Sequence, residues 1–430
     1  MIYRFLTQFA LVLLFCVTSL VLPLPAALAQ HADSEQQVAA YFPPASEFFV
    51  SISDQQQIPD NIVTKLAQDS YGRLWIGSAG GLVRYDGYRF RRYLQSSPLS
   101  LQNKNLINNS IAGNFVRDLL HASDGTLWLA TAPGGIQRYD SGNDSFYQPN
   151  ITAPGIADDF GSQVQAITED SNGNIWLAGN QGMVLLNQNG QVMQFVPPQT
   201  ELQDIRALLT DPQGNLWIGS RHGLFLLPPG SAGPQQIQTS GIELGQVLAL
   251  ARVANEIWLG TAGAGAFVIQ SNRNLKPVTE TIAADNTPGP VYDILQVSDD
   301  EVWLAGFAGI MRVNPTNKKL LGYYQHDMSN SFSLAHQDVR TLLKDRAGKI
   351  WLGGYGGGLQ RFDGQAGVST LRQSLVDDGS ISSGNISSVL ELTNGRIWLG
   401  SRGKGIEVID PISGIVARHQ PQADTPGKLE

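Results

Sequence analysis

Hydrophobic residues recur along this chain in one short phrase: an aliphatic residue, tryptophan, a second aliphatic residue, and then glycine or alanine. All eight tryptophans of the sequence occupy that phrase: Trp75, Trp128, Trp176, Trp217, Trp258, Trp303, Trp351 and Trp398. Successive tryptophans are 41 to 53 residues apart. A repeat of about 40 to 50 residues is typical of β-propellers, in which each repeat forms one blade. The pattern therefore predicts an array of eight repeats.

Each repeat contains four short apolar segments separated by turn residues. In the first copy they are Ile62 to Asp69, Leu74 to Gly77, Leu82 to Tyr85, and Tyr88 to Tyr93. The first segment recurs in the later copies at Val116, Val164, Ile205, Val247, Val291, Val339 and Ile386. Short apolar runs bounded by turns predict strands. We therefore expect every copy to form a four-stranded antiparallel meander.

The first segment of some repeats also has the spacing of a helix face, as at Val339, Leu342 and Leu343. These segments contain only about seven residues between turns, whereas a helix would need about 10 to 12. Each one is also followed by a turn of the Asp-Gly or Asn-Gly type, such as Asp124-Gly125, which favours a hairpin. The predicted fold class is therefore all-β, a propeller of four-stranded blades.

The tryptophan of each repeat needs a neighbouring blade in order to be buried. Its side chain offers about 150 to 250 Å² of surface, and a single four-stranded sheet has no interior to receive it. The position after the Trp-aliphatic pair is small, which would let adjacent sheets approach closely: Gly77, Ala130, Gly219, Gly260 and Gly400. The eight tryptophans are thus predicted to be structural residues.

Two arrangements of the eight repeats are consistent with the sequence. Glu47 to Ile52 resembles a fourth strand displaced to the front of the chain, which could close a ring by completing its last blade. The eighth copy has its own candidate fourth strand at Ile415 to His419. The chain thus forms either one eight-bladed ring, or a seven-bladed ring followed by the start of a second ring that is truncated at the C-terminus.

The N-terminus has the features of a secretory signal peptide over residues 1–29. Arg4 precedes an apolar run from Phe9 to Leu22, and Ala27-Leu28-Ala29 forms a small-x-small cleavage site. Residues 30–46 are expected to be a linker, and 47–430 a sensor domain in the periplasm. The only cysteine, Cys16, leaves with the signal. A net charge of −8 without a basic cluster disfavours nucleic acid as a partner.

The phrase from Asp69 to Gly87 resembles the two-component regulator propeller repeat, and Asp345 to Asp363 matches it nearly as well. The resemblance implies the periplasmic ligand-sensing region of a bacterial receptor anchored in the inner membrane. In such receptors two seven-bladed propellers and a β-sandwich precede a membrane helix and an output module, a histidine kinase or a diguanylate cyclase. This chain lacks those later parts. Any catalytic activity is therefore expected in a downstream domain.

The sequence contains no zinc-ligand spacing, phosphate-binding loop or nucleophile elbow. The six histidines are scattered through loops and strand ends without an acidic or serine partner at a recognisable spacing. The glycine-rich run from Gly354 to Gly358 occupies the repeated hairpin turn and precedes a strand, where a dinucleotide site would need a helix. We therefore expect no catalytic residue, no metal and no cofactor.

A ligand site is expected on the face where the hairpins between second and third strands open together with the connections between blades. The hairpin residues differ between copies while their framework stays constant, which suits recognition. The candidate ligand-binding residues are Asn180, Gln181, Arg221, His222, Phe307, Tyr355, Arg402 and Lys404.

The leading hypothesis is a sensor whose ligand is a small molecule or an oligosaccharide. Its other expected partners are the membrane-anchored output domain of the full-length protein and a second copy in a homodimer. One alternative is an exported propeller lyase or hydrolase, because streptogramin lyase-like rings have a similar blade. Another is a protein-interaction scaffold.

Overall fold

The repeats fold into eight four-stranded antiparallel sheets. The computed structural model describes residues 47–52, 57–95, 110–239, 241–270, 273–278, 289–328, 330, 332–365, 381–410 and 414–420. The predicted signal peptide and linker lie outside these described residues. Within the described ranges, no helix is long and apolar enough to cross a membrane. The segment around Val339, for which a helix was also considered, is a strand.

Seven of the sheets are the blades of one ring, and an eighth follows them in the chain. Blade one consists of β2 (Val63–Gln68), β3 (Leu74–Ser78), β4 (Leu82–Tyr85) and β5 (Phe90–Tyr93). Blade two consists of β6 (Phe115–His121), β7 (Leu127–Ala132), β8 (Gly135–Asp140) and β9 (Ser145–Tyr147). Blade three consists of β10 (Val164–Glu169), β11 (Ile175–Gly179), β12 (Gly182–Leu186) and β13 (Val192–Val196). Blades four and five consist of β14 (Ala207–Thr210), β15 (Leu216–Ser220), β16 (Gly223–Leu227) and β17 (Gln235–Gln236); and β18 (Val247–Val253), β19 (Glu256–Thr261), β20 (Ala266–Ile269) and β21 (Leu275–Pro277). Blades six and seven consist of β22 (Val291–Gln296), β23 (Val302–Gly306), β24 (Gly309–Val313) and β25 (Leu320–Tyr324); and β26 (Val339–Lys344), β27 (Ile350–Gly354), β28 (Leu359–Gln365) and β1 (Glu47–Ser51). The eighth sheet consists of β29 (Ile386–Glu391), β30 (Ile397–Ser401), β31 (Gly405–Asp410) and β32 (Gly414–His419).

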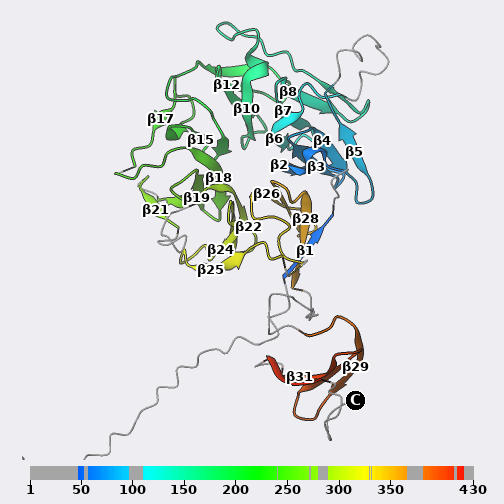
Figure 1. Ribbon diagram of the computed structural model, residues 1–430. Coiled ribbons are helices and arrows are strands. Elements are labelled where there is room, and N and C mark those ends of the chain that lie inside the picture. Colours follow the sequence, from blue (N-terminus) through cyan, green and yellow to red (C-terminus); the bar gives the residue numbers. More distant parts are fainter. Residues whose placement is uncertain are drawn as a thin grey trace, which may run out of the picture.

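The seven blades surround a common axis, with the first strand of each blade innermost (Figure 1). These inner strands contact one another in the order β2, β6, β10, β14, β18, β22, β26 and again β2. The chain thus returns to its starting point after seven blades. Two short 3-10 helices, η1 (Pro59–Asn61) and η4 (Phe160–Gln163), precede β2 and β10.

Strand β1 closes the ring by serving as the fourth strand of the seventh blade. It pairs antiparallel with β28, with Val50 opposite Arg361. Phe49 is buried there, with its ring centroid 5.0 Å from that of Phe362 and 5.3 Å from that of Tyr324. The structure therefore decides between the two predicted arrangements. The ring has seven blades and is completed by the front strand, and the eighth sheet is separate from it.

The blades are held together by contacts between neighbours. Gly77 of β3 faces Val116 of the next inner strand so closely that a Cβ on the glycine would lie 2.5 Å from the valine side chain. Only a residue without a side chain allows this approach. The same contact recurs between Gly219 and Val247, Gly260 and Val291, and, where the ring closes, Gly353 and Val63. These pairs confirm that small residues at this position permit close packing of the sheets.

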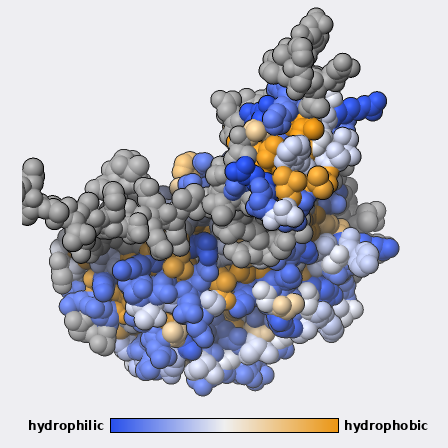
Figure 2. Space-filling model, turned by 90° about the horizontal axis from the view of Figure 1, so that it is seen from below, coloured by the Kyte–Doolittle hydropathy of each residue, from blue (hydrophilic) through white to orange (hydrophobic). Residues whose placement is uncertain are grey.

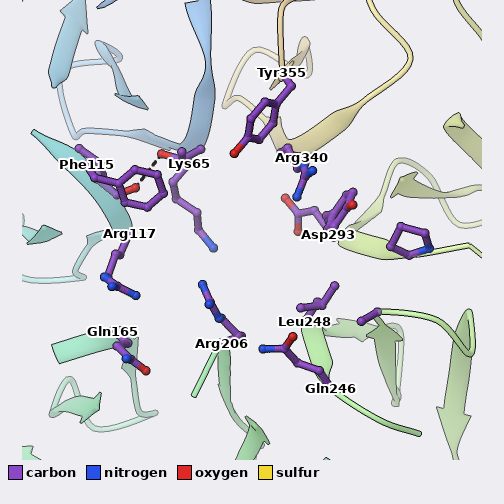
Figure 3. A pocket seen from close by; sticks show the side chains of 15 residues that line it. Lys65, Phe115, Arg117, Gln165, Arg206, Gln246, Leu248, Asp293, Arg340 and Tyr355 are labelled. Atoms are coloured by element: carbon purple, nitrogen blue, oxygen red, sulfur yellow. Dashed lines mark hydrogen bonds between the residues drawn. The ribbon is translucent and has the colours of Figure 1, made fainter. Parts of the chain in front are cut away.

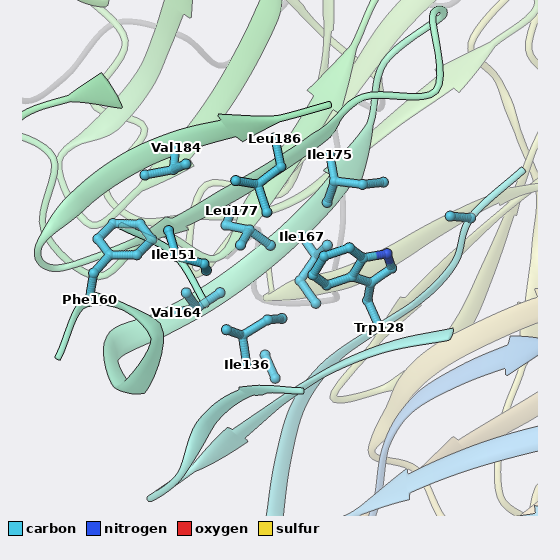
Figure 4. Packing of buried hydrophobic residues seen from close by; sticks show 12 residues of the cluster. Trp128, Ile136, Ile151, Phe160, Val164, Ile167, Ile175, Leu177, Val184 and Leu186 are labelled. Atoms are coloured by element: carbon cyan, nitrogen blue, oxygen red, sulfur yellow. The ribbon is translucent and has the colours of Figure 1, made fainter. Parts of the chain in front are cut away.

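The tryptophans lie in the interfaces between blades, as predicted, in seven of the eight repeats. Each of these seven is at most 6% exposed: Trp75, Trp128, Trp176, Trp217, Trp258, Trp303 and Trp351. Figure 4 shows one interface, in which Trp128 of the second blade packs with Ile167, Ile175 and Leu177 of the third. Burial of such large side chains stabilises adjacent sheets against each other.

The eighth repeat departs from this prediction, because Trp398 is only partly buried. No following sheet covers it among the described residues. On the inner strand of the same sheet, Val389 and Leu390 are 64% and 58% exposed, whereas the valines and leucines on the inner strands of the ring are buried or half-buried. Figure 2 shows exposed hydrophobic residues gathered on the smaller lobe of the molecule. The sheet thus has the sequence of a blade without the neighbour that a blade requires.

Several buried indoles donate a hydrogen bond to an acidic side chain on the preceding turn. These pairs are Trp75 with Asp69 at 2.9 Å, Trp217 with Asp211 at 2.9 Å, and Trp351 with Asp345 at 2.8 Å. In the second blade Ala122 stands where the first has Asp69. There the buried donors Nε1 of Trp128 and Nε of Arg138 have no hydrogen-bond partner among the described residues.

We expect Phe49→Ala to lower the free energy of unfolding by about 3–5 kcal/mol, the usual loss for a buried aromatic side chain. The substitution empties the position where β1 packs against blades six and seven. Chemical denaturation measures the loss, and Tyr88→Ala, at a side chain that is 95% exposed, is the matched control. Equal stability of the two variants would contradict closure by β1.

Ala122→Asp should raise the melting temperature, because its carboxylate would accept hydrogen bonds from Trp128 and Arg138. Leaving a buried donor unpaired costs about 1–3 kcal/mol. Conversely, Asp211→Ala should lower the free energy of unfolding by a similar amount, since it removes the acceptor of Trp217. Differential scanning calorimetry compares both variants with Ala157→Asp, which places the same charge at an exposed site. A loss of stability in Ala122→Asp would show that the turn cannot place a carboxylate there.

Candidate functional site

A cavity of about 470 Å³ lies on the axis of the ring, where the inner strands meet. Every blade contributes to it the residue that directly follows the buried valine or isoleucine at the start of its first strand. These seven axial residues are Thr64, Arg117, Gln165, Arg206, Leu248, Tyr292 and Arg340. Figure 3 shows most of them together with Lys65, Asp293 and Tyr355, which also line the cavity.

A β-bulge at the axial position explains why six of these side chains face the cavity; the seventh, Arg206, directly precedes β14, whose pairing with β15 has no such shift. In β6 the residues on either side of Arg117 pair with adjacent residues of β7, Thr131 and Ala130, so Arg117 is the extra residue. The same shift in pairing occurs at Thr64, Gln165, Leu248, Tyr292 and Arg340. A bulge bends the strand and redirects the side chain of the extra residue. The axial residues can therefore vary without disturbing the paired residues around them.

Three cationic side chains point toward one another in the cavity, namely Lys65, Arg117 and Arg206 (Figure 3). Lys65 Nζ lies 3.4 Å from Asp118 Oδ1, and Arg206 Nε lies 2.9 Å from Asp204 Oδ1. Arg117 makes no hydrogen bond or ion pair with another described residue. Burial, and then the like charge of Arg206, lower the pKa of the Arg117 guanidinium. The Arg117 side of the cavity is therefore electropositive.

Arg340 differs from Arg117 because its charge is fully engaged. It donates to Asp338 through Nε at 2.5 Å and Nη2 at 2.8 Å. Its guanidinium carbon also lies 3.7 Å from the ring centroid of Tyr292 and 4.6 Å from that of Tyr355. Although burial opposes it, the hydrogen bonds from Arg340 to Asp338 leave the pKa of Arg340 raised. The pair of tyrosines and the carboxylate thus hold Arg340 in one orientation.

Two aspartates at equivalent repeat positions connect the cavity wall to the next blade. Asp118 accepts a hydrogen bond from the backbone N–H of Ile167 at 2.8 Å, and Asp293 accepts one from that of Leu342 at 2.8 Å. Burial raises the pKa of Asp293. The attraction of Asp118 raises the pKa of Lys65. The acidic groups near the cavity therefore fasten inner strands to one another.

Four segments match the family model described as the two component regulator propeller: residues 57–80, 159–181, 202–222 and 333–356. Each segment covers the inner strand and the tryptophan strand of one blade in the ring. Four of the seven blades thus contain a segment that matches this family model. This agrees with the resemblance of the phrase from Asp69 to Gly87.

Solved structures with a similar fold include two extracellular domains from B. thetaiotaomicron. That of the hybrid two-component system BT3049 has a TM-score of 0.68 at 22% identity, over 87% of this chain and 49% of its own. That of BT4673 has a TM-score of 0.58 at 18% identity, over 86% of this chain and 53% of its own. This chain thus spans about half the length of these relatives.

Virginiamycin B lyase from Staphylococcus aureus is a more distant structural neighbour. Its TM-score is 0.54 at 13% identity, over 74% of this chain and 99% of its own. At such identities the likeness concerns the fold alone. No curated protein matches the sequence significantly.

The structure places the predicted ligand-binding residues in several separate parts of the molecule. Tyr355 lines the axial cavity, whereas Asn180 and Arg221 share a separate surface hollow with Asp204, and Phe307 lies in a small apolar groove. Gln181 donates to Asp159 at 2.9 Å, and His222 is exposed in its hairpin. Arg402 and Lys404 are exposed on the hairpin of the eighth sheet. Of the eight, only Tyr355 lines the axial cavity.

The axial residues themselves were not among the candidates predicted from the sequence. Their signal is present in the repeat, because threonine, arginine, glutamine, leucine or tyrosine follows a valine or isoleucine that recurs in every blade of the ring. In a regular strand, side chains alternate between the two faces of the sheet, so the sequence would place this residue on one of those faces. Only the strand pairing shows the bulge that turns it toward the axis.

The axial cavity has the side chains of a binding site rather than those of a recognisable reaction centre. Its lining includes no histidine. Among the residues that the structure describes, no group of three or more His, Cys, Asp or Glu side chains could hold a metal ion. What the cavity offers is an electropositive side, hydrogen-bonding amides at Gln165 and Gln246, and apolar or aromatic surface at Leu248, Phe115 and Tyr355.

Asp118→Ala should lower the free energy of unfolding by about 1–3 kcal/mol, because it leaves the N–H of Ile167 without an acceptor and Lys65 without its ion pair. Asp118 is 8% exposed, so water would not replace it fully. Denaturant titration can compare this variant with Asp124→Ala, at an exposed turn. A smaller loss for Asp118→Ala than for Asp124→Ala would contradict the role of Asp118 between blades two and three.

Proposed function

We propose that this regulator propeller is the ligand-binding input region of an exported bacterial receptor. A small molecule or an oligosaccharide occupies the axial cavity, and the ring passes its occupied state to a membrane-anchored output domain of the full-length protein. The observation that carries the proposal is the axial cavity, to which each of the seven blades presents one variable side chain, six of them from a β-bulge.

The size of the cavity supports a small ligand. Ligand sites usually have volumes of about 300–1,000 Å³, and this one measures about 470 Å³. A ligand there would touch side chains from blades that are far apart in the sequence but adjacent in the ring. Because a ligand that binds the folded ring stabilises it, such contacts would tighten the connections between blades. That change is a physical signal that a neighbouring domain can receive.

The structural neighbours support export and sensing. The domains of BT3049 and BT4673 are described as extracellular parts of two-component systems. The signal peptide expected at residues 1–29 would place this ring outside the cytoplasm as well. A fusion of the chain to alkaline phosphatase, which is active only after export, tests this part of the proposal.

Catalysis is the second candidate function, because virginiamycin B lyase has a similar fold. The axial cavity does not favour it, since its lining contains no histidine. Binding without chemical change is the function that these side chains support best.

Binding is tested by the thermal stability of the purified protein in the presence of sugars, amino acids and organic acids. A ligand at 100 times its Kd stabilises the folded state by about 2.7 kcal/mol, which raises the melting temperature by several degrees. Leu248→Trp should abolish this rise, because the larger side chain fills the cavity.

Leu320→Trp is the matched control, since Leu320 lies on the outer strand β25 and is 40% exposed. This variant should respond to the ligand like the original protein. The proposal fails if no compound stabilises the protein, or if Leu248→Trp binds the ligand unchanged.

A further inference from the structure

We propose that the ligand of the axial cavity carries a carboxylate, which binds between Arg117 and Arg206, and an apolar part that lies against Leu248. This inference rests on the proposed function and adds the chemical class of the ligand. It follows from which charges around the cavity are paired and which are not.

Arg117 is the cation whose charge the protein leaves without a partner. It projects into the cavity from the bulge in β6 and has no hydrogen bond or ion pair with another described residue. A charged group taken from water is unfavourable unless an opposite charge or hydrogen bonds replace the water. Arg206 increases the penalty, since its like charge acts on Arg117. An anion placed between the two guanidinium groups removes both unfavourable effects.

The other charged groups at the cavity already have partners. Arg206 is paired with Asp204, Lys65 with Asp118, and Arg340 with Asp338. Asp204 engages Arg206 through Nε at 2.9 Å and Nη2 at 3.1 Å. Arg117 therefore offers its whole guanidinium group to a ligand, and Arg206 offers only the N–H groups that Asp204 leaves. Arg117 is therefore the residue that gives the cavity its preference for an anion.

Asp293, the acidic residue that lines the cavity, is already engaged by backbone donors. Its two oxygens accept the backbone N–H groups of Ile294 at 2.9 Å and Leu342 at 2.8 Å. The positive charge of Lys65 also acts on it. Asp293 thus fastens β22 to β26 and leaves the Arg117 side of the cavity positive.

The geometry of guanidinium groups favours a carboxylate. A guanidinium presents two parallel N–H donors, which match the two oxygens of a carboxylate. Two such groups from blades two and four can approach one carboxylate from different directions. The contacts are charge-assisted, so they are stronger than neutral hydrogen bonds.

The opposite side of the cavity is suited to an apolar group. Leu248 lies across the cavity from Arg117 in Figure 3. Tyr355, which is 41% exposed, and Phe115, which is 37% exposed and lies beside Arg117 in Figure 3, add aromatic surface to the cavity. Covering this surface stabilises a complex in proportion to the apolar area removed from water. The ligand class is thus a small organic acid with an apolar or flat body.

The test compares three carboxylates with their neutral amides: phenylacetate, indole-3-acetate and glucuronate. Isothermal titration calorimetry and thermal shift are measured on the original protein, Arg117→Gln, Leu248→Trp and Arg252→Gln. Arg252 is an exposed arginine on β18 that does not line the cavity, so its variant is the matched control. Arg117→Gln should weaken carboxylate binding by about 10- to 100-fold, the usual effect of removing a hydrogen bond to a charged group.

The melting temperature without ligand distinguishes a binding role from a structural one. Removing one of two facing cations should leave it unchanged or higher in Arg117→Gln, whereas a structural arginine would lower it. The inference is overturned if only the amides bind, or if Arg117→Gln binds the carboxylates as tightly as before. In both of those cases, loss of binding in Leu248→Trp would leave the proposed function intact. If no probe binds in a way that Leu248→Trp blocks, the axial site itself is refuted, and the inference with it.

Discussion

The contact between the inner strand of one blade and the second strand of the blade before it is the interaction on which this protein depends. A single four-stranded sheet buries little by itself, so each tryptophan, as at Trp75, needs the following blade in order to leave water. The approach of Val116 to Gly77 makes the two sheets close enough for that burial. Because the last such contact joins Gly353 to Val63, the condition is satisfied for every blade only when the ring is closed.

The same constraint explains the eighth sheet. It has the tryptophan phrase, the turns and four strands, yet Trp398 is only partly buried and Val389 is exposed. Among the residues that the structure describes, no following blade covers this sheet. A repeat therefore forms its four strands by itself, whereas full burial of its tryptophan requires a neighbouring blade.

The β-bulge of the inner strand separates stability from recognition. The residues on either side of Arg117 belong to the paired and buried framework, whereas Arg117 itself is the extra residue and faces the axis. Changes at this position alter the chemistry of the cavity with little effect on the packing between blades. A repeat protein can in this way keep one architecture and still present a different side chain from each copy, which is what a site for one specific ligand requires.

The sequence by itself determined the blade, because its signals are local: the aliphatic-tryptophan phrase, the glycine turns and the small residue at Gly77. It predicted four-stranded repeats and burial of the tryptophans, which the structure confirms for seven of them. Two features depended on contacts between distant residues. Closure by β1 requires the pairing of Val50 with Arg361, and the axial cavity brings Arg117 beside Arg206 through the curvature of the ring. Among the residues chosen from the hairpins, only Tyr355 lines that cavity, since a variable loop position does not indicate how far it lies from the axis. Only the tertiary structure decided these points, because strand pairing across the whole chain and the number of blades in a ring are not local properties.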